Sequence, residues 1–114
     1  MTDQTRAAIQ GFHDALNSRD IDALAAWVHE DCVFETTAPP DGLRHVGRDA
    51  VLAACSEFFA GSPDARFEME EINIFDDRAF VLWHYAWTDG HVRGVDVMRV
   101  RDGKVVETFA YVKG

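Results

Sequence analysis

The second half of the chain carries the pattern that most limits its fold: four long segments with the composition of β-strands. They are rich in β-branched and aromatic residues and run from Arg66 to Phe75, Ala79 to Thr88, His91 to Arg101 and Lys104 to Lys113. The pairs Asp76-Asp77, Asp89-Gly90 and Asp102-Gly103 separate them as tight-turn signals. Strands joined by such short turns run antiparallel, so this half predicts a meander.

The first half predicts three helices and one short strand. The helices show as apolar stripes at helical spacing: Ile9, Phe12 and Leu16; then Leu24, Trp27 and Val28; then Val51, Cys55 and Phe58. Asp20 can cap the second helix, and the stretch from Cys32 to Thr37 has strand propensity. Helices followed by a meander favour an α+β fold, with three N-terminal helices on one face of a curved antiparallel sheet. We expect one domain, residues 1–114.

Composition excludes several classes of function. The net charge of -9 and a pI near 4.8 argue against binding to nucleic acid or to an anionic membrane surface, which requires clustered Lys and Arg. No apolar run approaches the ~20 residues of a membrane span, and the stretch MTDQTRAAIQ lacks the apolar core that a secretory signal would have. Cys32 and Cys55 match neither a disulfide framework nor a metal motif, so we expect reduced core thiols in a cytoplasmic protein without metal or cofactor.

Asp96 raises the main question about function, because it interrupts the apolar strand 91–101. Aspartate is uncommon in strands and costly to bury without a partner, so its direction decides whether it carries chemistry. Three-residue loops at both Asp-Gly turns would pair Asp96 with Leu82 and with Thr108. One face would then carry Leu82, His84, Ala86, Gly94, Asp96, Met98, Thr108 and Ala110, and the other Trp83, Tyr85, Trp87, Arg93, Val95, Val97, Phe109 and Tyr111.

A two-residue Asp-Gly loop in the first hairpin is the alternative. It would put Trp83 opposite Asp96, because a one-residue slip moves every side chain of a strand to the other face. The sequence leaves this register open. The three-residue loop gathers small and polar residues on one face and large aromatic residues on the other.

The stretches DALNSRDIDALAAWVHEDCVFE, VGRDAV and RGVDVMRVRDGKVVE, in this order, resemble the nuclear transport factor 2-like superfamily. The SnoaL-like and ketosteroid-isomerase-like branches are the most similar, over Thr5 to Gly114. The resemblance implies a cone-shaped sheet whose concave side is closed by the helices around an apolar pocket. It also implies that the face with Asp96 lines this pocket.

The ketosteroid isomerase site carries over only in part. Asp96 matches that family's protonated aspartic acid, but Phe12 replaces the tyrosine of the oxyanion hole. Thr36 stands where the basic carboxylate belongs, and its neighbour Glu35 lies on the opposite face of its strand. Steroid isomerisation is therefore not supported. SnoaL-like polyketide cyclases, which use a pocket aspartate as acid and base, resemble this chain better.

We therefore expect an acid/base enzyme (cyclase, isomerase or dehydratase) for a small lipophilic carbonyl compound, with Asp96 and His84 as the catalytic pair. The alternative is a ligand-binding or accessory protein in which the two side chains only satisfy each other. The residues expected to bind the substrate are Phe12, Leu16, Trp27, Phe34, Thr36, Val51, Cys55, Phe58, Leu82, Met98, Thr108 and Ala110. His13, His29 and His91 are expected at the surface.

The face opposite Asp96 predicts a homodimer. It would expose Trp83, Tyr85, Trp87, Val95, Val97, Phe109 and Tyr111 as one apolar patch. Soluble monomers rarely leave such a patch in water, and the relatives suggested by the resemblance dimerise through this surface. Arg93 and Arg99 would form part of its polar rim.

Overall fold

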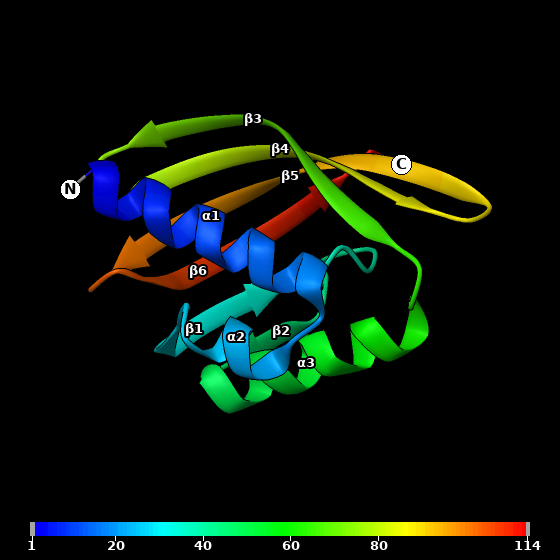
Figure 1. Ribbon diagram of the computed structural model, residues 1–114, viewed down its shortest axis with the longest axis horizontal. Helices are drawn as coiled ribbons and strands as arrows, with labels where there is room; N and C mark the ends of the chain where they lie inside the picture. The colour runs from blue at the N-terminus through cyan, green and yellow to red at the C-terminus, as the bar shows by residue number, and fades with distance from the viewer. Residues whose placement is uncertain (1, 114) are drawn as a thin grey trace.

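The computed structural model describes residues 2–113, which form three helices and one six-stranded sheet (Figure 1). The elements are α1 (Thr2–Ser18), α2 (Ile21–Ala25), β1 (Val28–Glu35), β2 (Arg44–Val46), α3 (Arg48–Gly61), β3 (Arg66–Phe75), β4 (Arg78–Trp87), β5 (Gly90–Arg101) and β6 (Lys104–Val112). The strand order is β2-β1-β6-β5-β4-β3. The predicted α+β class is confirmed.

The sheet is mixed and not purely antiparallel as predicted, because β1 pairs parallel with β6 while every other pair is antiparallel. A parallel partner requires a long connection, and here α3 and the first three strands of the meander supply it. The short strand β2 was not predicted. The second helix is shorter than predicted: Asp20 caps it by accepting from the backbone N–H groups of Asp22 and Ala23, but Trp27 lies beyond its end and Val28 starts β1.

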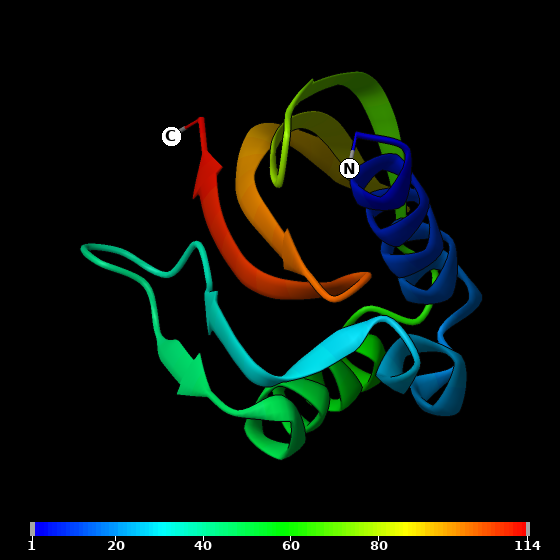
Figure 2. The same cartoon turned by 90° about the vertical axis from the view of Figure 1, so that its left-hand side faces the viewer.

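The meander curls so that its concave side faces the helices (Figure 2). Helix α1 crosses this side in contact with β3 to β6, and α3 packs against β1 and β2. The hydrophobic core fills one end of the concave side, with residues such as Ile9, Leu24, Val81, Val100 and Val105. The opposite end, beside the β4–β5 hairpin, is not filled and holds the cavity described below.

The register of the first hairpin differs from our preferred prediction. Trp87 pairs with Gly90 across a two-residue loop, Thr88 and Asp89, so Trp83 lies opposite Gly94 and Val81 opposite Asp96. The three-residue loop was wrong by one residue. That one residue exchanges the two faces of β4 relative to β5.

The second hairpin also has a two-residue loop, yet the predicted faces hold there. Asp102 and Gly103 adopt φ values of 54° and 75°, as a type I′ turn requires. A β-bulge then shifts the register between Arg99 and Val100, so that Asp96 lies opposite Ala110 and not opposite Thr108 as predicted. The bulge supplies the extra residue that we had assigned to the turn.

Candidate active site

An apolar cavity of about 260 Å³ lies between the concave side of the sheet, α1 and α3. Its lining consists of Phe12, Leu16, Phe34, Thr36, Thr37, Ala54, Cys55, Phe58, Phe67, Trp83, Tyr85, Trp87, Val92, Asp96, Thr108, Ala110 and Val112. Asp96 is the only carboxylic acid among these residues. Pockets for drug-sized ligands span roughly 300–1,000 Å³, so this cavity suits a compound of one or two rings.

Most of the predicted pocket residues line the cavity: Phe12, Leu16, Phe34, Thr36, Cys55, Phe58, Asp96, Thr108 and Ala110. Three others, Trp27, Val51 and Met98, belong to the hydrophobic core instead. Val51 and Met98 lie on the predicted faces of α3 and β5, but at the filled end of the concave side. The spacing along the helix or strand predicted which face these residues occupy. It could not predict whether they lie beside the cavity or at the filled end of the concave side.

Leu82 and His84 do not face the cavity, which corrects the predicted catalytic pair. The register of the first hairpin turns both toward the convex side, where Leu82 is 38% exposed and the ring of His84 contacts that of His91. The same correction applies to Trp83, Tyr85 and Trp87. They line the cavity, so they do not form part of the convex patch.

Asp96 is buried at 7% exposure, and its two carboxyl oxygens have different neighbours. Oδ1 accepts a hydrogen bond of 3.0 Å from the indole Nε1–H of Trp83. Oδ2 lies 3.9 Å from Nε2 of His13. Burial raises the pKa of Asp96 to about 7, and the hydrogen bond from Trp83 opposes this shift. A carboxyl group with this pKa exchanges its proton near neutral pH.

His13 was expected at the surface, but it is 1% exposed on the inner side of α1. Its ring meets those of Phe12 and Phe67 edge-on, at centroid distances of 5.6 and 6.3 Å. Neither ring nitrogen has a hydrogen-bond partner among residues 2–113. Burial lowers the pKa of His13 to about 4, while the charge of Asp14 acts to raise it. His13 is therefore a neutral imidazole at physiological pH.

Aromatic side chains form one wall of the cavity. Tyr85 lies between Phe67 and Phe58, with ring centroids 4.7 and 5.4 Å away, and contacts Trp87 at 5.7 Å. The Tyr85 hydroxyl is buried and has no partner in the described part of the chain. Gly94 leaves the space for Trp83, because a Cβ atom there would lie 2.5 Å from the indole ring.

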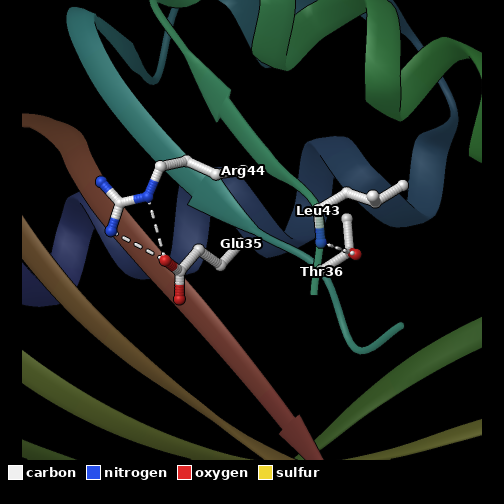
Figure 3. Close-up of polar contacts among 4 residues, drawn as sticks. All are labelled: Glu35, Thr36, Leu43 and Arg44. Atoms are coloured by element: carbon white, nitrogen blue, oxygen red, sulfur yellow. Dashed lines mark hydrogen bonds and ion pairs between the residues drawn. The ribbon is translucent and has the colours of Figure 1, made fainter. Parts of the chain in front are cut away.

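The end of β1 and the loop that follows form another part of the wall (Figure 3). Thr36 lines the cavity, and its Oγ1 accepts a hydrogen bond of 3.0 Å from the backbone N–H of Leu43, which ties the loop back to β1. Glu35 points to the other face of the strand, as predicted, and pairs with Arg44 at 2.7 Å.

Comparison with protein families gives one match, to the SnoaL-like domain, over residues 9–108. The chain belongs to the SnoaL-like family. An NTF2-like protein of unknown function from Mesorhizobium loti shares 43% identity with this SnoaL-like domain, over 99% of the chain and 93% of the relative, with a TM-score of 0.88. A comparison with curated sequences finds no match.

Two further crystal structures share the SnoaL-like fold. One is a candidate ketosteroid isomerase from Kribbella flavida: 24% identity over 99% of this chain and 80% of that one, TM-score 0.86. The other is a candidate polyketide cyclase from Sinorhizobium meliloti: 21% identity over 90% of this chain and 92% of that one, TM-score 0.80. At these identities the likeness concerns the fold alone.

Sequence reasoning missed His13, although a signal for it was present. It follows Ile9 by four residues, the spacing that places both on one face of a helix. Gly94 was a second missed signal, since a glycine inside a strand often marks a close approach. Among residues 2–113, no three His, Cys, Asp or Glu side chains lie close enough together to bind a metal ion, and no helix is long and apolar enough to cross a membrane.

Proposed function

We propose that this SnoaL-like domain catalyses proton transfer at a carbon next to the carbonyl of a small lipophilic compound, as a cyclase, isomerase or dehydratase step requires. The observation that carries the proposal is Asp96, the single carboxylic acid of an apolar cavity. Its pKa of about 7 means that the acid and base forms are both populated near neutral pH. One group can then remove a proton and return it at another position.

A second candidate function is ligand binding without turnover. This function is favoured by Thr36, which stands where the resemblance to ketosteroid isomerase would place the basic carboxylate. A threonine cannot act as that base, and its hydroxyl oxygen already accepts a hydrogen bond from the Leu43 N–H. In that case protonated Asp96 would only donate a hydrogen bond to the ligand. We retain a cytoplasmic location as a prediction in either case.

Hydrogen–deuterium exchange separates the two functions. With the two-ring ketone 2-tetralone as probe in D₂O, NMR would follow the loss of its α-protons, and ligand-observed NMR would report binding. We expect the wild type to accelerate exchange, by ~10²–10⁴-fold for general acid/base catalysis. Asp96→Asn should return the rate to that of buffer and keep binding, and exposed Glu57→Gln, on α3, should behave as wild type.

Two results would decide against catalysis by Asp96. Full exchange in Asp96→Asn would show that another group is the base. Binding to wild type without any exchange would favour the ligand-binding function.

We also propose a two-fold homodimer through the convex side of the sheet, with a patch that differs from the predicted one. Two cross-strand rows build it: Phe80, Val97 and Phe109, and Leu82, Val95 and Tyr111. Phe80 and Leu82 are each 38% exposed and Tyr111 is 56% exposed. This convex patch supports the proposal because contiguous exposed apolar side chains mark interaction sites.

A further inference from the structure

Two buried titratable side chains, His13 of α1 and Asp96 of β5, approach each other beside the cavity. Asp96 lines the cavity, whereas His13 does not. A buried neutral imidazole has one nitrogen that donates and one that accepts, and each needs a partner. Neither nitrogen has one among the described residues, and Asp96 Oδ2 lies 3.9 Å from Nε2.

The indole of Trp83 decides which oxygen of Asp96 carries the acid proton. An indole N–H can only donate, so Oδ1, 3.0 Å away, must accept. The carbonyl oxygen of a carboxylic acid is a better acceptor than its hydroxyl oxygen, so this hydrogen bond favours the arrangement of neutral Asp96 in which the proton lies on Oδ2. This is the oxygen that faces His13.

We propose that His13 and Asp96 form a pair that shares one proton, in which Nε2 of His13 accepts a hydrogen bond from the protonated Oδ2 of Asp96. His13 is then a positioning residue for the acid of the proposed function, on which this inference rests. A movement of about 1 Å would shorten the 3.9 Å separation to hydrogen-bond length.

The pair gives the acid proton two places to go. With the cavity empty, the proton on Oδ2 points to Nε2. When a ligand carbonyl arrives, the O–H bond can turn away from Nε2 and donate to the carbonyl oxygen instead. His13 stays neutral in both arrangements, because its pKa of about 4 lies well below that of Asp96.

The charged groups that act on His13 are few. Asp14, on its own helix, is exposed and accepts a hydrogen bond of 3.0 Å from Gln10. Asp96 comes from β5, and from β3 the ring of Phe67 covers another side of the imidazole. A change in the ring nitrogen shifts of His13 above pH 5 is therefore expected to come from the loss of the Asp96 proton.

Nitrogen-15 NMR of the histidine rings tests the pair without any ligand. The His13 signals would be assigned through contacts with Phe12 and Phe67 and followed from pH 5 to 9. We expect His13 to stay neutral and its ring nitrogen shifts to change in one step, with a midpoint near pH 7 where Asp96 loses its proton. Asp96→Asn, which retains an oxygen for Trp83, should abolish the step.

Two controls come from the chain. Asp14→Asn should leave the step in place. His29, which is also buried and lies 3.7 Å from exposed Asp102, should behave alike in wild type and Asp96→Asn.

The inference is overturned if the His13 step persists in Asp96→Asn, if no step occurs, or if His13 becomes an imidazolium near pH 6.5. Failure of the pair is distinguishable from failure of the proposed function. A step at His13 without exchange of 2-tetralone protons contradicts catalysis alone, and Asp96-dependent exchange without a step contradicts the pair alone.

Discussion

Asp96 and His13 have pKa values that move toward each other's ordinary range, and burial is the main cause in both. Asp96 keeps its proton up to a pKa of about 7, whereas the unfolded chain releases it near 3.8. His13 stays unprotonated down to a pKa of about 4, whereas the unfolded chain binds a proton near 6.5. As pH rises from 4 to 6.5, unfolding releases a proton from Asp96 and takes one up at His13. The two effects on stability oppose each other in this range.

The first residue-scale prediction removes one of these effects. The stabilisation from neutral Asp96 is full below pH 3.8 and is lost as pH rises through 7, at about 1.4 kcal/mol per pH unit. Asp96→Asn has no such loss. Its free energy of unfolding relative to wild type should therefore rise by on the order of 4 kcal/mol between pH 4 and pH 8, measured by urea denaturation at one protein concentration. A pH-independent difference would contradict the raised pKa.

The second residue-scale prediction concerns the unpartnered hydroxyl of Tyr85. A buried polar group without a hydrogen bond costs about 1–3 kcal/mol, so Tyr85→Phe should leave the free energy of unfolding unchanged or raise it. The ring contacts to Phe58 and Phe67 are retained. A loss above about 1 kcal/mol in Tyr85→Phe would mean that the hydroxyl has a partner.

At the scale of elements, the β4–β5 and β5–β6 hairpins have similar Asp-Gly turn sequences but differ in whether the predicted faces of their strands are observed. Both loops contain two residues, but only β6 has a bulge after its turn. Without a bulge, β4 turns Trp83 and Tyr85 into the cavity. The close approach of β4, β5 and β6 then depends on Gly94, since a Cβ there would lie 2.2 Å from the backbone oxygen of Tyr111.

Gly94→Ala tests this close approach. The new methyl group would meet both the Trp83 ring and the backbone of β6, so strands must shift and Trp83 must move from Asp96. We expect a loss of about 1–3 kcal/mol in urea denaturation. The hydrogen bond from Trp83 lowers the pKa of Asp96, so its loss in Gly94→Ala should raise that pKa further.

Gly61→Ala provides the matched control. A Cβ at Gly61, the last residue of α3, meets nothing within 4 Å, so this variant should be as stable as wild type or slightly more stable. Equal stability of Gly94→Ala and wild type would show that the strands have room to spare at this position.

At the scale of the whole molecule, the cavity and the convex patch lie on opposite sides of the same strands. Successive side chains of a strand point to opposite faces of the sheet, so the strand residues that do not face the cavity face the convex side. Arg44 lies over the ring of Phe109 at 5.8 Å. On the same side, Arg93 forms an ion pair of 3.1 Å with Glu70, and Arg99 lies 3.9 Å from Glu107. A polar border around an apolar centre is typical of protein interfaces.

Leu82→Glu should break the proposed homodimer, because it puts a charge at the centre of the convex patch. Light scattering at micromolar concentration should give twice the 12.8 kDa of one chain for wild type and one chain for the variant. Leu43→Glu, at a 61% exposed residue away from the patch, should remain dimeric. A wild-type mass of one chain would refute the dimer.

The sequence by itself determined the order of the helices and of every strand except β2, the α+β class and about half of the cavity lining. Helical stripes and strand alternation are local patterns, and they predicted the inward positions of Phe12, Cys55, Asp96 and Thr108. The resemblance to SnoaL-like proteins rested on the same patterns, and the family match confirms it.

Only the tertiary structure decided which partners Asp96 has. The face of β4 depends on one residue of loop length, and two-residue and three-residue turns have compatible sequences here. His13 reaches Asp96, 83 residues later in the chain, because α1 packs across the concave side of the sheet. Contacts of this kind leave no periodic trace in the sequence, since they arise from packing between distant elements and not from local conformation.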